Sequence, residues 1–215
     1  GGQFPFNTNV DRLDYSNDTA TGLLKSQVNT ATYQYQATGN QNFGYIGGGV
    51  SGNETTVQRI NYASDDLAAA PKGGFVNQKR NGAASGNADF GYFAGGRNPS
   101  ISPDILSSVG RVDYSNDTNT ALVKGPLPIG VYNLGGTGNA NFGYFAGGRA
   151  PDTVSTINRI DYSNDTATAV EKGPLSVNRF SLAGTSSRAN GIPSTATVNY
   201  AAGTYGTPNT GYFIG

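Results

Sequence analysis

The chain has 215 residues, with fourteen basic and fourteen acidic side chains and therefore no net charge, and it lacks His, Cys, Met and Trp. A neutral chain has no net field that would attract nucleic acid or an anionic membrane surface, so nucleic-acid binding is not expected. No run approaches the ~18 apolar residues needed to span a bilayer, so membrane insertion is not expected either. The missing His and Cys exclude Ser-His-Asp, Cys-His and zinc sites. The abundant Gly, Tyr and Phe favour strands and turns over helices.

A hexapeptide, Asp-Tyr-Ser-Asn-Asp-Thr, recurs along the chain with a period of roughly 50 residues. Asn and Asp tolerate left-handed backbone and bond their own main chain, so each copy predicts a tight turn. The copies are Asp14–Thr19, the decayed Asn61–Asp66, Asp113–Thr118 and Asp161–Thr166, with a fainter copy at Ser194–Tyr200. A fixed period of this length is typical of repeat architectures.

A second motif, an aromatic strand ending in a Gly pair, alternates with the hexapeptide. Its copies are Phe43–Gly48, Phe90–Gly96, Phe142–Gly148 and the C-terminal Gly211–Gly215. The chain begins with Gly1 and Gly2, so placing the C-terminal copy beside them rebuilds one more motif. This predicts a ring that is closed by pairing of the N- and C-terminal strands.

Each repeat divides into about four short strands when turn residues are taken as boundaries. In the fourth copy, strands are expected at Asn141–Ala146 and Thr156–Tyr162, followed by a hairpin turn at Ser163–Thr166. Ala167–Glu171 leads out of the turn, and Phe180–Gly184 begins the next sheet.

The repeat unit resembles the kelch repeat: a strand ending in Gly-Gly, an Arg-Ile-Asp-Tyr strand, a polar turn and a Lys-Gly-Pro-Leu segment such as Lys172–Leu175. The Trp expected after the kelch turn is missing, and Val170 or Leu122 stands in its place. The resemblance implies an all-β, kelch-like β-propeller of four-stranded antiparallel blades. Five blades are expected, one of them degenerate, because the strand expected near Ser186–Ile192 is short and polar; four blades plus an insertion is the alternative.

A single domain spanning residues 1–215 is therefore expected, in which the last repeat closes onto residues 1–2. The approximate repeats are 1–43, 44–90, 91–142, 143–191 and 192–215. The sequence Gly-Tyr-Phe-x-Gly-Gly followed by Arg-Ile-Asp-Tyr-Ser-Asn-Asp-Thr also resembles repeat-rich virion proteins of marine tailed bacteriophages. That resemblance implies a structural or tail-fibre-associated protein in the virion or another extracellular location, with virion or surface proteins as partners.

Carboxylates are the main catalytic groups that remain to this chain. A glycosidase needs two of them about 5–9.5 Å apart. Glu54 and Glu171 are the only Glu residues, and most Asp residues lie in the repeated block. An active site is a singular feature, whereas these are scaffold positions, so no enzyme is expected and a propeller glycosidase is the weaker alternative.

The spacing of oxygen-bearing side chains at Asp14, Ser16 and Asp18, repeated in later copies, resembles the opening of calcium loops. The Gly and the distant Glu of such loops are absent, and turn chemistry explains the same residues. No cofactor is therefore expected, and calcium stays the alternative interpretation.

An Arg recurs two residues before the first acidic or amide residue of each main hexapeptide copy. These Arg residues are Arg12, Arg59, Arg111 and Arg159, and the residues that follow them are Asp14, Asn61, Asp113 and Asp161. A period of two places each pair on one strand face, which predicts a ring of Arg–carboxylate contacts between blades.

Segments that break the repeat are the candidate ligand-contact loops, because recognition is usually built on loops of a rigid scaffold. The candidate residues are Tyr33, Tyr35, Arg97, Asn98, Asp104 and Tyr205. Tyr, Asn and Gln also suit sugar contacts by stacking and hydrogen bonding, so a lectin-like propeller that binds host glycans is the alternative to a protein-binding module. Tyr33 and Tyr35 equally fit strand positions that fill a core.

Overall fold

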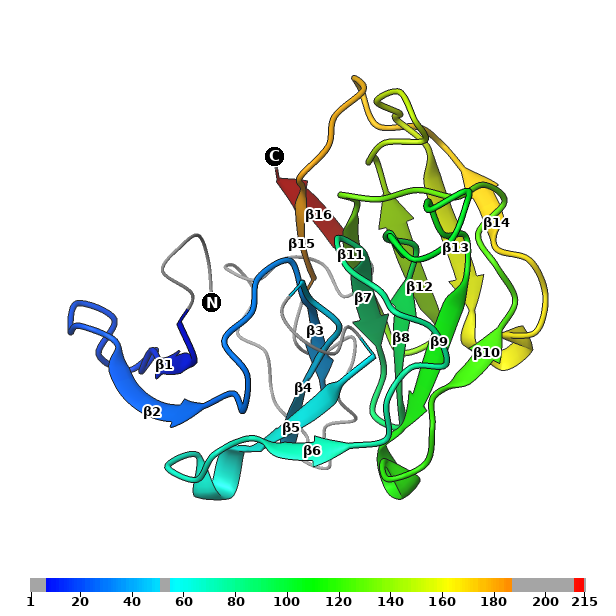
Figure 1. Cartoon of the computed structure of the whole chain (residues 1–215). Coiled ribbons are helices and arrows are strands. Elements are labelled where there is room, and N and C mark those ends of the chain that lie inside the picture. Colours follow the sequence, from blue (N-terminus) through cyan, green and yellow to red (C-terminus); the bar gives the residue numbers. More distant parts are fainter. Residues whose placement is uncertain (1–6, 51–54, 187–210, 215) are drawn as a thin grey trace.

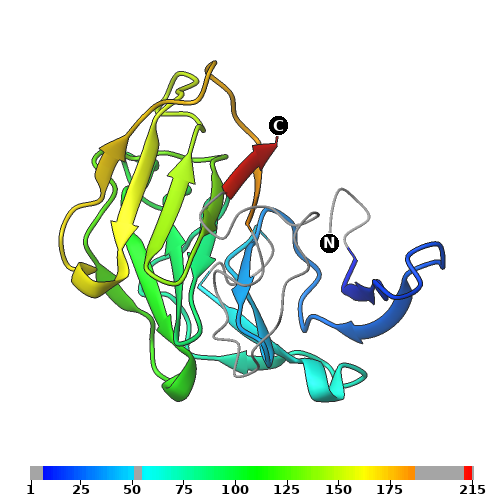
Figure 2. The ribbon, with the colours of Figure 1, turned by 180° about the vertical axis from the view of Figure 1, so that it is seen from behind.

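The computed structural model describes residues 7–50, 55–186 and 211–214, and in these the chain forms short antiparallel strands with three 3₁₀ turns. The strands form three four-stranded sheets and two two-stranded sheets. In Figures 1 and 2 the sheets follow one another in chain order around an arc, as the blades of a propeller do. The expected all-β, propeller-like architecture is confirmed at this level.

Each four-stranded sheet contains four strands that are consecutive in the sequence. Their bounds are β3 (Gln36–Gly39), β4 (Phe43–Gly47), β5 (Val57–Asn61) and β6 (Ala70–Lys72); β7 (Ala83–Gly86), β8 (Phe90–Ala94), β9 (Val109–Asp113) and β10 (Leu122–Lys124); and β11 (Gly135–Gly138), β12 (Phe142–Ala146), β13 (Ile157–Asp161) and β14 (Val170–Lys172). The third set confirms the strands expected at 141–146 and 156–162.

The two remaining sheets have two strands each. One pairs β1 (Asn9–Arg12) with β2 (Leu23–Gln27), and the other pairs β15 (Ala183–Ser186) with β16 (Gly211–Ile214). By sequence motif, β15 and β16 match the first two strands of a complete sheet, and β1 and β2 match its last two strands.

Sheet register repeats from one sheet to the next. The Tyr of each Phe-Gly-Tyr strand lies opposite the Arg of the following strand, as Tyr45↔Arg59 in the first four-stranded sheet and Tyr92↔Arg111 in the second. The guanidinium carbon of Arg59 lies 4.3 Å from the ring centre of Phe43, and the same contact recurs in the other two four-stranded sheets. The repeat therefore fixes side-chain positions as well as strand positions.

In the hexapeptides that end β5, β9 and β13, the second to fourth residues form a 3₁₀ turn. These are η1 (Tyr62–Ser64), η2 (Tyr114–Asn116) and η3 (Tyr162–Asn164). The residue before each turn accepts a hydrogen bond from a backbone N–H two positions later, for example Ser163 N–H to Asp161 Oδ1 at 3.0 Å. The turn expected at 163–166 is thus confirmed, with a side-chain cap.

The hydrophobic core lies between successive sheets. Tyr92 and Phe145 belong to one cluster that joins the second and third four-stranded sheets, and Tyr45 and Phe93 belong to another that joins the first and second. All four side chains are fully buried. Aromatic rings of this size bury ~150–250 Å² each, so they supply much of the packing between sheets.

A belt of backbone hydrogen bonds runs from sheet to sheet, just before the strands β3, β7, β11 and β15 begin. The N–H groups of Asn81, Asn133 and Ser181 donate to the carbonyls of Gln34, Asn81 and Asn133 at 3.0, 2.7 and 2.8 Å. All four residues have a φ between 55° and 61°, a left-handed conformation that Asn tolerates better than most residues. The belt ties neighbouring sheets at one end of the strands.

The two ends of the described chain do not close a ring. Among the described strands, β16 pairs only with β15 and β1 pairs only with β2, so the expected pairing of the terminal strands is not present. Residues 1–2, residue 215 and the segment 187–210, which holds the expected degenerate strand, lie outside the described residues. The described part also contains no helix with the length and apolar character of a membrane span.

Candidate functional site

In the hexapeptides that follow β9 and β13, the second Asp makes an ion-paired contact with the preceding sheet, which we call the Asp latch. Asp117 accepts hydrogen bonds from Tyr45 Oη and Arg59 Nη1, both at 2.8 Å, and its other oxygen lies 3.1 Å from Lys72 Nζ. All three donors come from the sheet β3–β6. A buried carboxylate that receives three donors joins two sheets by charge as well as by packing.

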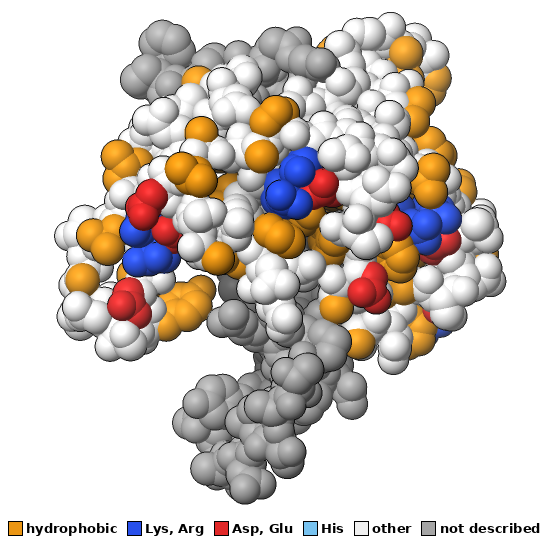
Figure 3. Space-filling model, turned by 90° about the horizontal axis from the view of Figure 1, so that it is seen from below, with side chains coloured by type: hydrophobic (Ala, Val, Ile, Leu, Met, Phe, Trp, Pro, Cys, Tyr) orange, Lys and Arg blue, Asp and Glu red, His pale blue; other side chains and the backbone are white. Residues whose placement is uncertain are grey.

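The same latch recurs at the next junction. Asp165 accepts from Tyr92 Oη at 2.9 Å and Arg111 Nη1 at 2.8 Å, and lies 3.1 Å from Lys124 Nζ. A partial version joins β1–β2 to the first four-stranded sheet, where Arg12 Nη1 lies 2.8 Å from Asp65 Oδ2. Figure 3 shows Lys and Arg side chains in separate groups, with acidic side chains beside them.

The expected Arg–carboxylate contacts between sheets are thus present for Arg12, Arg59 and Arg111, but the predicted partner was wrong. The Asp two residues after Arg111, Asp113, accepts hydrogen bonds from Ser115 N and Oγ at 2.9 and 2.7 Å. The bond from the Ser115 hydroxyl holds the pKa of Asp113 below its usual value. The first Asp of the hexapeptide caps the turn, and the second Asp reaches the neighbouring sheet.

In the alternative calcium interpretation, Asp14 would supply a metal ligand, but its Oδ1 atom has other partners. Asp14 Oδ1 accepts from Ser16 N at 2.9 Å and from Ser16 Oγ at 2.7 Å, and these bonds lower the pKa of Asp14. Within residues 7–50, 55–186 and 211–214, no group of three or more His, Cys, Asp or Glu side chains is placed to hold a metal ion.

The end of the strands opposite the hexapeptide turns carries Arg side chains stacked on aromatic rings. We call this surface the arginine–aromatic face and define it by Arg97 with Tyr132 and by Arg149 with Phe180. The guanidinium carbons lie 5.0 Å and 4.2 Å from the centres of the respective rings. Arg97 and Arg149 each follow a Gly pair, whose positive φ angles turn the chain out of β8 and β12.

The structure brings together three of the predicted ligand-contact residues at this face. Arg97 Nε donates to Asp104 Oδ2 at 2.7 Å, and the two residues form an ion pair. Asn98 is buried; its backbone N–H donates to the Asp104 carbonyl at 2.8 Å, and its side chain accepts from Ser100 N at 3.0 Å. Asn98 therefore shapes the loop, whereas Arg97 presents its stacked guanidinium.

The other three predicted residues divide differently. Tyr33 and Tyr35 flank Gln34, the first residue of the backbone belt, and both side chains are half-buried. Burial raises the pKa of the Tyr35 hydroxyl. Tyr205 lies outside the described residues.

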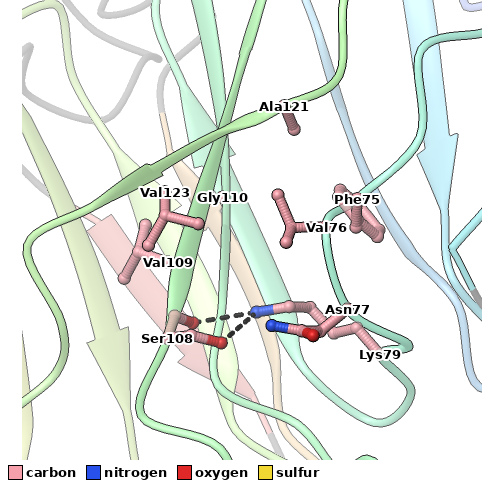
Figure 4. A pocket seen from close by; sticks show the side chains of 9 residues that line it. All are labelled: Phe75, Val76, Asn77, Lys79, Ser108, Val109, Gly110, Ala121 and Val123. Carbon is pink, nitrogen blue, oxygen red and sulfur yellow. Dashed lines mark hydrogen bonds between the residues drawn. The ribbon is translucent and has the colours of Figure 1, made fainter.

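Lys79 was not among the predicted site residues, and the structure buries it to 3% exposure beside a small cavity of about 50 Å³. Its ammonium donates to the Ser108 carbonyl at 2.8 Å and to Ser108 Oγ at 3.2 Å (Figure 4). It also donates to the Phe93 carbonyl at 3.3 Å. Burial lowers its pKa to about 7. The signal was available in the repeat, because Val131 occupies the matching position in the next copy.

A groove of about 340 Å³ lies between the second and third four-stranded sheets, at their hexapeptide end. Asn and aromatic side chains line it, including Asn87, Phe90, Asn141 and Phe142, together with Asp161 and Ser163. A ring face beside amide groups is a surface on which a sugar can stack and bond.

Comparison with known proteins supports the fold alone. No protein-family model matches the chain, and no curated protein does so at a significant level. A solved structure described as "Structure of YjhT" superposes with a TM-score of 0.64 at 11% sequence identity, covering 82% of this chain. The chain spans 65% of the length of that structure.

Proposed function

We propose that this chain is a non-catalytic binding or structural module of a virion or another extracellular assembly, which contacts other proteins or a host surface. The observation that carries the proposal is the use of the repeated carboxylates. Asp117 and Asp165 are held in latches, and Asp113 and Asp161 cap turns. A hydrolase of this fold would need carboxylates that are free to act on a substrate.

The arginine–aromatic face is the contact surface that best fits this function. Arg97 and Arg149 stack on rings from neighbouring segments, and this stacking holds their guanidinium groups in place. Among the described residues, no carboxylate forms an ion pair with Arg149. Arg and aromatic residues are enriched at the centres of protein interfaces. A fixed guanidinium offers such a partner a paired hydrogen bond at little entropic cost.

The finer architecture is part of the proposal. Kelch-like repeats are supported by the order of the Gly pair, the Arg-Ile-Asp-Tyr strand, the polar turn and the Lys-containing outer strand in each sheet. Five blades, one of them degenerate, is one arrangement. In the alternative, β15 and β16 combine with β1 and β2 in a fourth blade, and residues 187–210 form an insertion.

The location is tested on virions purified from a tailed phage that carries this sequence. An antibody raised against the chain is expected to label the tail or its fibres in electron micrographs. Purified virions that lack the chain in mass spectrometry would contradict a virion location.

The contact function is tested by titrating labelled protein onto host cells. Arg97→Ala with Arg149→Ala is expected to weaken binding at least about tenfold, as loss of interface anchors does. Asp66→Asn, an exposed change at the other end of the strands, is the matched control. Equal binding by wild type and the double variant would show that another surface makes the contact.

A lectin-like function is the second candidate, and the groove between the second and third four-stranded sheets favours it. A glycan array that returns hits for the wild type, and none for Phe142→Ala at equal folded concentration, would support sugar binding there. An array without hits counts against it.

A further inference from the structure

Four contacts recur wherever one four-stranded sheet meets the next. At the first junction, Tyr114 stacks on Tyr45 with ring centres 4.5 Å apart, and Asp117 enters the latch. The Asp117 carbonyl accepts from Gly73 N at 2.8 Å, and a Cβ atom on Gly73 would collide with the Asn119 carbonyl. The hexapeptide of one sheet thus covers the outer strand of the sheet before it.

The second junction repeats each contact. Tyr162 stacks on Tyr92 at 4.6 Å, and Asp165 enters the latch. The Asp165 carbonyl accepts from Gly125 N at 2.8 Å, and a Cβ on Gly125 would collide with the Ala167 carbonyl. Equivalent partners at nearly equal distances at the two junctions define a specific docking geometry.

The third four-stranded sheet presents the same receiving groups with nothing docked on them in the described residues. We call Tyr144, Arg159, Lys172 and Gly173 the open socket. Tyr144 is half-buried, whereas Tyr45 and Tyr92 are fully buried, and Lys172 is exposed. A Cβ on Gly173 would meet no atom within 4 Å. Arg159 is nevertheless held over Phe142 at 4.3 Å, the distance found in both filled sockets.

One hexapeptide in the described chain has no socket, namely the loop Asp14–Ala20. Tyr15 is 82% exposed, and no described residue forms an ion pair with Asp18. The loop already has the shape of the docked copies: Asp14 caps Ser16, and Ala20 N donates to the Asn17 carbonyl at 3.2 Å, as Ala167 N does to Asn164. It needs no refolding to dock.

The two-stranded sheets β1–β2 and β15–β16 are also complementary, because together they supply the four strands of one complete sheet. β16 has no second neighbour among the described strands, and neither has β1. An open strand edge is a template for pairing with another strand. By analogy with Tyr45↔Arg59, adding β1 to β16 places Tyr212 opposite Arg12 and completes a four-stranded sheet.

We propose that the open socket on the sheet β11–β14 binds the Asp14–Ala20 loop of a second copy of this chain, while β1 of that copy pairs with β16. The carboxylate of Asp18 fits between the cationic groups of Arg159 and Lys172, as Asp165 fits between Arg111 and Lys124. A second copy can fill the open socket and pair with the free edge of β16, while β1–β2 of each copy keeps its contact with Asp65. The contact is head to tail, so each copy keeps one donor loop and one socket for further copies.

The test uses two single variants with different lesions. Asp18→Lys disables the loop, and Gly173→Val blocks the socket at a position open to solvent. In analytical ultracentrifugation, wild type is expected to self-associate with rising concentration. Each variant alone is expected to weaken association at least about tenfold, because losing one side of a desolvated charge pair or of close packing is costly in an interface.

Mixing the two variants separates the proposal from simple misfolding. Asp18→Lys retains a working socket and Gly173→Val retains a working loop, so an equimolar mixture is expected to form a one-to-one dimer and nothing larger. Asp152→Lys, an exposed charge reversal at the opposite end of the strands, is the control and should associate like wild type. A wild type that stays monomeric at all concentrations, or a mixture that forms no dimer, would overturn the proposal; the first result would favour closure within one chain.

Discussion

At the scale of single residues, the Asp latch concentrates charge in a nearly buried position. Burial raises the pKa of Asp165, but hydrogen bonds from Tyr92 and Lys124 outweigh this and leave the pKa lowered. We expect Asp165→Asn to reduce the free energy of unfolding by about 3 kcal/mol, because Arg111 and Lys124 would stay buried without their counter-charge. Urea denaturation followed by circular dichroism measures this.

Asp66→Asn is the control for that change. Asp66 lies 2.9 Å from Lys25, but its side chain is 77% exposed, so the loss should be below about 1 kcal/mol. Equal losses in the two variants would mean that the latch contributes no more than a surface ion pair.

Lys79 gives the folded protein a pH dependence. Because its folded pKa of about 7 lies below the ordinary value of 10.5, the unfolded chain binds more protons between these values, and stability rises with pH there. The slope approaches about 1.4 kcal/mol per pH unit at most. Burial raises the pKa of Tyr45, Tyr92 and Tyr114, so their contribution is lost above about pH 10.

Urea titrations between pH 6 and 10 are therefore expected to show rising stability for wild type. Lys79→Met should flatten the rise, because it removes the titrating amine while keeping the volume of the side chain. Lys172→Met makes the same chemical change at an exposed position and, measured at a concentration where the chain is monomeric, should keep the wild-type slope. A wild-type profile without a rise would mean that Lys79 stays charged when buried.

At the scale of elements, one feature of the hexapeptide could be predicted from the sequence and another could not. The turn could be predicted, because Asp and Asn at fixed offsets bond their own backbone and need no distant partner. The different roles of Asp161, which caps the turn, and Asp165, which contacts the previous sheet, could not be predicted. The partners of Asp165 lie in the previous repeat and depend on how the sheets dock. Asp161 and Asp165 look alike in the sequence and differ only in their neighbours.

Gly125 and Gly173 occupy the same position in successive sheets and differ only in what covers them. Gly125→Ala is expected to cost about 1–3 kcal/mol, because the added methyl group would collide with the Ala167 carbonyl and separate two sheets. Gly173→Ala, measured at a concentration where the chain is monomeric, should change stability by less than about 0.5 kcal/mol. Chemical denaturation of both variants checks the pair, and equal effects would contradict the docking geometry.

At the scale of the whole molecule, periodicity predicted the all-β, propeller-like architecture, because a repeat of this length must bury its faces against its neighbours. Periodicity also predicted closure by pairing of the terminal strands, which the described strands do not show, because a repeat pattern does not determine how the first and last sheets meet. Arg97 and Asp104 could be selected from the sequence as a break in the repeat. Lys79, in the loop between β6 and β7, could have been selected only by aligning the repeats, which places it opposite Val131.

Unequal burial along the arc predicts unequal local stability. Tyr92 and Phe93 in β8 are fully buried between sheets, whereas the apolar packing beside the described sheet β1–β2 is the small cluster of Val28, Ile60 and Ala69. Amides of β1 and β2 are expected to exchange with solvent at least about 100-fold faster than those of β8, because opening them breaks fewer buried contacts. Hydrogen exchange followed by NMR on the Asp18→Lys variant measures this without self-association.

The outer strand β10 is the control that separates an edge effect from an effect of sheet size. It also lies at an edge, but of a complete sheet, and its amides should exchange at an intermediate rate. Protection of β1 equal to that of β8 would show that a fourth sheet is completed within one chain.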